Sequence, residues 1–403
     1  MKKKLAIISL NLPFPLNNGG AIAQYFFLKK LQHIYDLTFI TTLNEKDAEN
    51  YLNELKKKLP KINFIVFKDY QEKQTKPNVI LSLKIFLYNL LYSKKKNQNN
   101  IQENPILYVF STANFKDFII KHFQINQYDY IQCEFFETID LIDFLPKDNK
   151  TIFIHHEIRF KSIELQKSKN ISIDWIMNLK KMELDFLKKF QKIVVFNLND
   201  KLLLEKDIQK EKLIISEFGI LSDNIYRSSV SETFNKLVFT GGQSHYSNYE
   251  GLMWFLNTIY LPHYDKINFE MIIVGKWRED FKEDYKKFTN IKFLGFVDDL
   301  GAVFENAVLL NPILSGSGIR TKVLEAFANR VPVISTPIGA EGLYSETEHN
   351  HLMIFENEKE FLRIFENYFS NNNLAELSEK GFEYYQKYFN EELLLQKRIQ
   401  IYE

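Results

Sequence analysis

A glycine-rich loop followed by two cations is the part of the sequence best suited to chemistry. The loop Ser315-Gly-Ser-Gly318 follows a short apolar run, 307–310, and precedes apolar residues at helical spacing. Its small residues let backbone N–H groups approach an oxyanion at the positive end of a helix dipole. Arg320 and Lys322 lie at the start of this expected helix, where a cation opposes the dipole unless an anion compensates it. The pattern predicts a phosphate site.

Glu325 adds a carboxylate to the same expected helix, five residues beyond Arg320. At that depth a carboxylate can accept two hydroxyl hydrogen bonds from a ribose, as the acidic residue of dinucleotide-binding folds does. A second glycine loop, 339–342, follows the next expected strand. The plainer interpretation, a solvated and charged helix start after a flexible turn, does not account for the coincidence of these features.

Two adjacent histidines, His155 and His156, end the apolar run 151–154. Histidine is the residue best matched to proton transfer at neutral pH, so both are candidate catalytic residues and we expect one of them to act. A metal site is disfavoured, because adjacent histidines project apart and no third ligand stands at useful spacing. The alternative is a histidine pair on a loop beside an ion pair between Glu157 and Arg159.

Glu134 ends a neighbouring expected strand, 129–134, and points to the same edge as the histidines. We therefore consider Glu134 a candidate acceptor-site residue, that is, one that binds the substrate receiving a transferred group. Two glycine pairs also follow expected strands: Gly19 with Gly20, and Gly241 with Gly242. Such a pair before a helix can cradle a phosphate or admit an acceptor, although a tight turn explains it about as well.

The segments that must position these residues alternate between strands and helices. In the first half we expect strands near 4–10, 37–42, 62–67, 129–134, 151–155 and 192–196, and helices near 20–34, 45–59, 112–126, 138–144 and 172–190. In the second half we expect strands near 236–240, 269–274 and 291–294, and helices near 249–259, 279–288, 357–369, 373–388 and 391–402. The alternation indicates an α/β fold with doubly wound parallel sheets, whose ligands gather at the carboxyl ends of strands.

Length and composition set the remaining bounds. At 403 residues the chain suits two domains of about 200 residues each, which we place at 1–220 and 221–403. A hydrophobic content of 45% with 26% charged residues is typical of a globular protein, and a net charge of +1 gives no indication of a nucleic-acid partner. The single cysteine, Cys133, excludes a disulfide framework and fits a reducing cytoplasm. The apolar run 5–10 is interpreted as a first strand and not as a signal peptide.

The stretch 311–343 resembles the donor-binding signature of the group 1 glycosyltransferases, family 4 of the sequence-based classification. Members of that family have two Rossmann-like domains that face a central cleft, the arrangement called GT-B, so the resemblance implies that fold here. The family usually has two glutamates separated by seven residues. Glu325 matches the second, and Ser317 stands where the first would be. The Gly-Ser-Gly-x-Arg-x-Lys form is similar to a subgroup found in bacterial surface-polysaccharide clusters.

The resemblance also implies roles for residues, and it implies that the last expected helix returns to the first domain. Residues expected to bind the donor are Gly19, Gly20, Gly241, Gly242, Phe296, Val297, Ser317, Gly318, Ile319, Arg320, Lys322 and Glu325. Arg320 and Lys322 are also expected to be catalytic, together with His155 or His156, because they would neutralise the leaving diphosphate. No metal and no cofactor are expected.

We therefore predict a cytoplasmic, metal-independent glycosyltransferase of the hexosyltransferase type. It would move a sugar from a nucleotide-diphosphate donor to a glycan or lipid-linked acceptor in cell-surface polysaccharide assembly, with retention of configuration. Two alternatives are a non-catalytic GT-B partner subunit that binds nucleotide and a nucleotide-sugar epimerase. No nucleic-acid partner is expected.

The segment 79–96 bears on the membrane. Wound as a helix, residues 79–92 present a narrow polar stripe and an otherwise apolar surface, followed by Lys94, Lys95 and Lys96. It is too short to span a bilayer but could lie in its interface, with the lysines meeting anionic headgroups on the inner face. The alternative, a helix buried in the first domain, is the commoner fate of an apolar helix.

Overall fold

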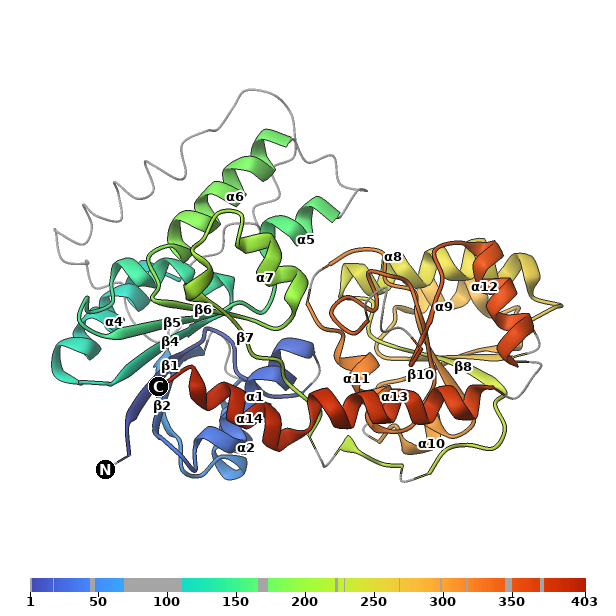
Figure 1. Cartoon of the computed structure of the whole chain (residues 1–403), viewed down its shortest axis with the longest axis horizontal. Coiled ribbons are helices and arrows are strands. Elements are labelled where there is room, and N and C mark those ends of the chain that lie inside the picture. Colours follow the sequence, from blue (N-terminus) through green and yellow to red (C-terminus); the bar gives the residue numbers. More distant parts are fainter. Residues whose placement is uncertain are drawn as a thin grey trace. The chain divides into compact units, whose positions relative to one another are not determined.

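A computed structural model describes residues 2–16, 18–43, 48–68, 111–165, 173–221, 224–227, 229–267, 269–297, 299–316, 318–344, 350–369 and 373–403 (Figure 1). The segment 79–96 and Ser317 lie outside the described residues. The chain forms two compact units, which we call domain 1 (Met1–Ser216 with Lys397–Glu403) and domain 2 (Glu217–Gln396).

Domain 1 contains a seven-stranded parallel sheet in the order β3-β2-β1-β4-β5-β6-β7. The strands are β1 (Lys4–Ile8), β2 (Asp36–Leu43), β3 (Asn63–Lys68), β4 (Tyr130–Glu134), β5 (Lys150–Ile154), β6 (Lys192–Val195) and β7 (Leu213–Ile215). The helices are α1 (Gly19–Leu31), α2 (Ala48–Lys58), α4 (Ala113–Ile125), α5 (Arg159–Leu165), α6 (Ile173–Leu187) and α7 (Leu198–Leu204), with the 3-10 helices η2 (Phe136–Asp143) and η3 (Lys210–Lys212).

The central strands of domain 1 form because their apolar runs are buried on both faces of the sheet. Every residue of β4 is buried, and in β1 and β5 only the first residue is exposed. Helix α1 begins where the Asn18 side chain accepts a hydrogen bond from the Ala21 N–H at 2.9 Å, an ordinary N-cap. The buried strands thus form the centre of the sheet, and α1 begins after the loop that leaves the carboxyl end of β1.

Domain 2 contains a six-stranded parallel sheet in the order β10-β9-β8-β11-β12-β13. The strands are β8 (Lys236–Thr240), β9 (Glu270–Val274), β10 (Ile291–Gly295), β11 (Ala307–Asn311), β12 (Val333–Ser335) and β13 (Met353–Ile354). The helices are α8 (Tyr246–Phe255), α9 (Glu279–Tyr285), α10 (Gly301–Phe304), α11 (Thr321–Ala328), α12 (Glu358–Ile364) and α13 (Leu374–Phe389), with the 3-10 helix η6 (Leu261–His263) and the π-helices η5 (Leu256–Tyr260) and η7 (Phe365–Phe369). Helix α14 (Glu391–Gln400) begins in domain 2 and ends in domain 1.

The predicted pair of doubly wound α/β domains is confirmed, and most elements lie within a few residues of their expected positions. The expected helix 138–144 is instead the 3-10 helix η2. The sequence patterns missed α5, α7, α10, β7 and β13, each of which has two to seven residues. Such short runs contain too few turns or alternations to show a period. No helix among the described residues is long and apolar enough to cross a membrane.

The segment Lys397–Glu403 belongs to domain 1, although it follows domain 2 in the chain. Figure 1 shows α14 leading to the C-terminus beside the domain 1 sheet. The Arg398 guanidinium is buried 3.6 Å from the centre of the Phe27 ring of α1 and donates to the Ser216 carbonyl at 3.4 Å. The Tyr402 ring packs against Tyr35 and Tyr130. This segment therefore completes the core of domain 1.

We expect Arg398→Ala to lower the free energy of unfolding of domain 1 by about 2 kcal/mol, because a desolvated cation–π contact and a buried hydrogen bond are lost together. Urea unfolding followed by circular dichroism measures the change. Gln400→Ala, an exposed change on the same helix, should stay within about 0.5 kcal/mol of the parent. Equal losses in the two variants would show that Arg398 does not hold the segment.

Candidate active site

The strand order of domain 2 reverses between β8 and β11, which pair directly. At such a switch point the loops that leave two adjacent strands run in opposite directions, and ligands of open α/β sheets bind in the crevice between them. The loop after β8 contains Gly241 and Gly242. The loop after β11 runs from Pro312 to Arg320 and leads into α11. The structure therefore brings these two predicted glycine loops to one edge.

The loop after β8 is held by its neighbours. The Gly241 carbonyl accepts a hydrogen bond from Trp277 Nε1 at 2.9 Å, and the Gly242 carbonyl accepts one from Asn248 Nδ2 at 3.2 Å. Asn248 lies on α8, so the loop and the start of that helix form one rigid corner.

The loop after β11 needs its glycines. Gly316 and Gly318 have φ angles of 103° and 86°, in the left-handed region that favours glycine. A Cβ on Gly316 would lie 3.1 Å from an Arg320 terminal nitrogen, so the loop wraps closely around that guanidinium. Ser315 is fully buried, and its hydroxyl donates to Glu250 Oε2 at 2.6 Å.

Lys322 lies in the first turn of α11. Its Nζ donates to Asn248 Oδ1 at 3.0 Å and lies 4.4 Å from the centre of the Phe239 ring. Burial, followed by the nearby Arg320 cation, lowers the pKa of Lys322 to about 7. The Lys322 and Arg320 cations therefore repel each other. In addition, no side chain caps the N-terminus of α11, so its first backbone N–H groups lack a side-chain acceptor. An anion with two or more charges would relieve both effects.

Glu325 lies one turn further along α11, and burial raises the pKa of its carboxyl group to about 7. Its carboxylate has no hydrogen-bond partner among the residues that the structure describes. A partly buried carboxylate that is left without a donor is suited to accept hydroxyl hydrogen bonds from a ligand. Cations, helix start and carboxylate thus form one cluster.

The remaining predicted donor residues occupy two places. Gly318 and Ile319 lie in the loop with Arg320, and Ile319 is buried. Phe296 and Val297 follow the edge strand β10, two strands away from β8, and Phe296 is 61% exposed. A large exposed aromatic side chain at the carboxyl edge of the sheet offers a flat surface for a planar group.

Two residues near this cluster were not among the predicted site residues. Glu250 reaches the loop after β11 through Ser315, and Asn248 joins Lys322 to the loop after β8. Both lie on α8, with Glu250 65 positions before Ser315 and Asn248 74 positions before Lys322. A carboxylate therefore lies beside this loop even though Ser317 replaces the glutamate usual in the resembled family.

In domain 1 the strand order reverses between β1 and β4. Gly19 and Gly20 begin α1 just after the loop that leaves β1. A Cβ on Gly20 would lie 2.7 Å from the Phe135 ring, so glycine permits the close approach of α1 to the residue after β4. The predicted glycine pair and the end of β4 are thus in contact.

His155 and His156 differ completely in surroundings. The His155 side chain is fully buried, with Nε2 2.9 Å from Glu183 Oε1 of α6. The same Glu183 carboxylate accepts backbone N–H groups of Arg159 and Phe160, both at 3.0 Å. His155 and Glu183 therefore anchor the start of α5.

His156 lies beside Glu134, the predicted acceptor-site residue. His156 Nε2 is 2.8 Å from Glu134 Oε2, and both side chains are nearly buried. The His156 ring stacks on Phe135 with centroids 3.8 Å apart and meets Phe196 edge-on. The two residues that the sequence placed at one edge thus form a pair. Arg159 contacts Glu137 at 3.0 Å and Glu157 at 3.6 Å.

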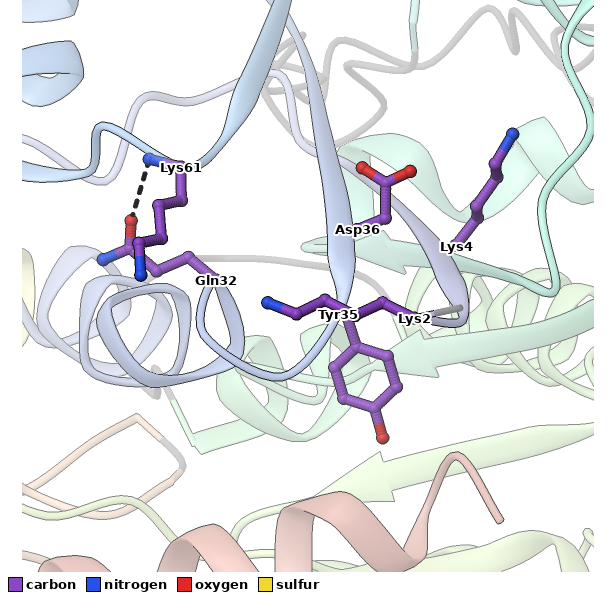
Figure 2. A pocket seen from close by; sticks show the side chains of 6 residues that line it. All are labelled: Lys2, Lys4, Gln32, Tyr35, Asp36 and Lys61. Atoms are coloured by element: carbon purple, nitrogen blue, oxygen red, sulfur yellow. Dashed lines mark hydrogen bonds between the residues drawn. The ribbon is translucent and has the colours of Figure 1, made fainter.

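A surface hollow lies at the opposite edge of the domain 1 sheet (Figure 2). Its lining includes Lys4, which begins β1, and Asp36, which begins β2, together with Lys2, Gln32, Tyr35 and Lys61. Because catalytic loops leave the carboxyl ends of parallel strands, this hollow at the amino ends is not part of the candidate site. Among the described residues, no group of three or more histidine, cysteine or acidic side chains is arranged to hold a metal ion.

The chain is similar to known proteins in sequence and in fold. Residues 235–371 match the family model described as "Glycosyl transferases group 1". A Klebsiella pneumoniae protein described as "Uncharacterized 44.6 kDa protein in cps region" is 24% identical over 409 residues, which cover 96% of each chain.

Solved structures share the two-domain fold. TarM of S. aureus has a TM-score of 0.67 at 12% identity, covering 100% of this chain and 99% of that one. Anabaena Alr3699/HepE in complex with UDP has a TM-score of 0.66 at 14% identity, covering 99% and 98%. At these identities the likeness concerns the fold alone.

We expect Glu183→Ala to lower the free energy of unfolding of domain 1 by about 3 kcal/mol, because two backbone N–H groups and His155 lose a buried partner. Glu164→Ala, an exposed change on α5, serves as the matched control and should cost less than about 0.5 kcal/mol. Urea unfolding measures both. A loss below 1 kcal/mol for Glu183→Ala would contradict an anchoring role.

Proposed function

We propose that the chain, as a group 1 glycosyltransferase with the GT-B fold, transfers a sugar from a nucleotide-diphosphate donor to a glycan or lipid-linked acceptor. The observation that carries the proposal is the cluster in domain 2, where Arg320, Lys322 and Glu325 surround an uncapped helix start at a switch point. Two cations suit the diphosphate, and the carboxylate suits the ribose.

The donor is proposed to lie along the carboxyl edge of the domain 2 sheet. The diphosphate meets the N-terminus of α11 together with Arg320 and Lys322, with the loop of Gly241 and Gly242 beside it. Glu325 accepts hydrogen bonds from the ribose hydroxyls. Phe296 and Val297 hold the nucleobase, Phe296 by its exposed ring. The UDP in the complex of Anabaena Alr3699/HepE supports a nucleoside diphosphate of this class.

The chemistry proposed for this site is displacement of the diphosphate by an acceptor hydroxyl. The bond between the sugar carbon and the diphosphate oxygen breaks while the bond to the acceptor oxygen forms on the same face, so configuration is retained. The acceptor proton passes to the leaving phosphate oxygen. Arg320 and Lys322 stabilise the charge that develops on the diphosphate, which often supplies the largest catalytic contribution. No metal is required by this route.

In domain 1 we assign the active histidine as His156. His155 lies against Glu183 with no exposed side-chain surface, so its role is to support the fold. His156 lies at the end of β5 beside the loop positions of Gly20 and Phe135, where a group acting on a sugar hydroxyl is expected.

The acceptor is proposed to belong to a cell-surface polysaccharide. The Klebsiella pneumoniae relative is described as lying in a cps region. We also propose that the segment 79–96 contacts the inner face of the membrane through its three lysines. Changing Lys94, Lys95 and Lys96 together to Ser should release the protein from anionic vesicles at low salt, and failure of the parent to co-sediment with such vesicles would remove this proposal.

We expect Glu325→Ala to weaken nucleoside-diphosphate binding by about 10- to 100-fold, the effect of losing a charged acceptor worth about 1.5–3 kcal/mol. Calorimetry with UDP and with GDP measures the affinity and identifies the preferred base. Glu305→Ala, an exposed change in the same domain, should bind as the parent does. Unchanged affinity in Glu325→Ala would remove the ribose role.

Lys322 should take up a proton when the diphosphate binds. With a pKa of about 7, roughly nine-tenths of Lys322 is neutral at pH 8, and the bound anion raises that pKa. The affinity should therefore fall as pH rises above 7, where free Lys322 loses its proton, and it should also fall as pH drops below 7, where Glu325 takes up a proton. Glu325 also has a pKa of about 7, so its carboxyl group is mostly ionised at pH 8 and releases few protons when the ligand binds.

Calorimetry at pH 8 in two buffers of different ionisation enthalpy counts these protons. The parent should take up close to one. Lys322→Arg should bind with no uptake, because a guanidinium stays charged, and Lys322→Met should bind more weakly with no uptake. Uptake that persists in Lys322→Arg would assign the proton to another group.

A further inference from the structure

A continuous chain of hydrogen bonds joins the segment Lys397–Glu403 to His156. The Tyr402 hydroxyl donates to Gln132 Oε1 at 2.5 Å. Gln132 Nε2 donates to Glu134 Oε1 at 2.6 Å, and Glu134 Oε2 accepts from His156 Nε2 at 2.8 Å. All four residues belong to domain 1, and Tyr402, Gln132 and Glu134 are each no more than 4% exposed.

The direction of every bond in this chain is fixed by chemistry. Burial raises the pKa of Tyr402, so its phenol keeps a proton to donate. That donor fixes the Gln132 amide with its oxygen toward Tyr402 and its NH₂ toward Glu134. The Glu134 carboxylate can only accept, so the His156 proton must sit on Nε2.

The other ring nitrogen of His156 is left with its lone pair. Nδ1 is buried and has no hydrogen-bond partner among the described residues. A buried polar atom without a partner calls for an explanation, and a role in binding or catalysis is one such explanation. The ring stacks on Phe135 at 3.8 Å and meets Phe196 edge-on, and turning it over would break the bond between Nε2 and Glu134.

The backbone adds a further constraint at Phe135. This residue has a φ of 68°, an uncommon conformation for a non-glycine residue with a bulky side chain. The conformation places the Phe135 ring between His156 and Gly20, where a Cβ would come within 2.7 Å of it. Strain of this kind persists only where the surroundings over-determine it, so the His156 ring is held from its face as well as from Nε2.

We propose that Tyr402, Gln132 and Glu134 are positioning residues that hold His156 as the Nε2–H tautomer, so that Nδ1 accepts a hydrogen bond from a substrate hydroxyl. The part concerning substrate rests on the proposed glycosyltransferase reaction. The tautomer of the His156 ring is a property of the protein without substrate and does not depend on that reaction. A structural ion pair between Glu134 and a doubly protonated His156 is the competing arrangement, and it would leave Nδ1 unable to accept.

The ring is tested first without substrate, by nuclear magnetic resonance of protein labelled with ¹⁵N at histidine. At pH 8 the His156 signals, assigned with His156→Gln, should show one slowly exchanging proton on Nε2 and none on Nδ1. A proton on Nδ1, alone or together with one on Nε2, would overturn the proposal.

The role of the segment 397–403 is tested by Tyr402→Phe, which removes one hydroxyl and keeps the ring. The His156 Nε2 proton should exchange about tenfold faster than in the parent, since Gln132 loses the donor that orients it. Tyr35→Phe removes a hydroxyl from the ring that packs on Tyr402 and should leave the exchange rate unchanged. Equal rates in the two variants would overturn the part played by Tyr402.

Kinetics then test positioning. With whichever of UDP-glucose, UDP-galactose, UDP-N-acetylglucosamine and GDP-mannose the parent consumes, Tyr402→Phe should lower kcat by about three- to tenfold and Glu134→Ala by about 100-fold, with KM for the donor unchanged. An unchanged kcat in Glu134→Ala, or a loss confined to KM, would overturn positioning. If the parent consumes none, the proposed donor class fails, while the ring-proton measurement still decides the tautomer.

Discussion

In each sheet the strands run in one direction, so every loop that follows a strand's carboxyl end emerges at the same edge. In domain 2 this constraint gathers Gly241, Arg320 and Phe296 from three separate strand ends. In domain 1 it gathers Gly20, Phe135 and His156. The opposite edges receive only strand starts and helix ends, such as Lys4 and Asp36. The distribution of chemically capable residues follows from strand polarity before any side chain is considered.

Without a ligand, the charged forms of Lys322 and Glu325, two titratable side chains of the domain 2 cluster, are disfavoured. Lys322 is pushed toward the neutral form by burial and by Arg320, and Glu325 is pushed toward the neutral form by burial alone. A ligand that brings an anion to one end and hydroxyl donors to the other restores the charged form of both. The hydrogen bond from Lys322 to Asn248, and the one from Ser315 to Glu250, keep α8 in place while the charges change. The arrangement favours selectivity for a ligand that satisfies both groups together.

The fold and the domain 2 loops could be predicted from the sequence, because long apolar strands and glycine-cation patterns are local features. The difference between His155 and His156 could not. Adjacent residues at a strand end point in opposite directions, and Glu183 and Glu134, which decide their roles, lie more than twenty residues away. Glu250 escaped notice because it reaches the site through Ser315, 65 positions later. Tyr402 is 270 positions from Gln132, and no local pattern relates them.

The return of the segment Lys397–Glu403 to domain 1 has a consequence for biosynthesis. Gln132 leaves the ribosome 270 residues before Tyr402, which at typical elongation rates is a delay of roughly ten to fifty seconds. The whole of domain 2 is made in that interval. Domain 1 must therefore wait in an incomplete form, with a gap beside Phe27 and Tyr130 that the later-made segment Lys397–Glu403 fills. Translation order thus delays the setting of His156 until domain 2 has been made.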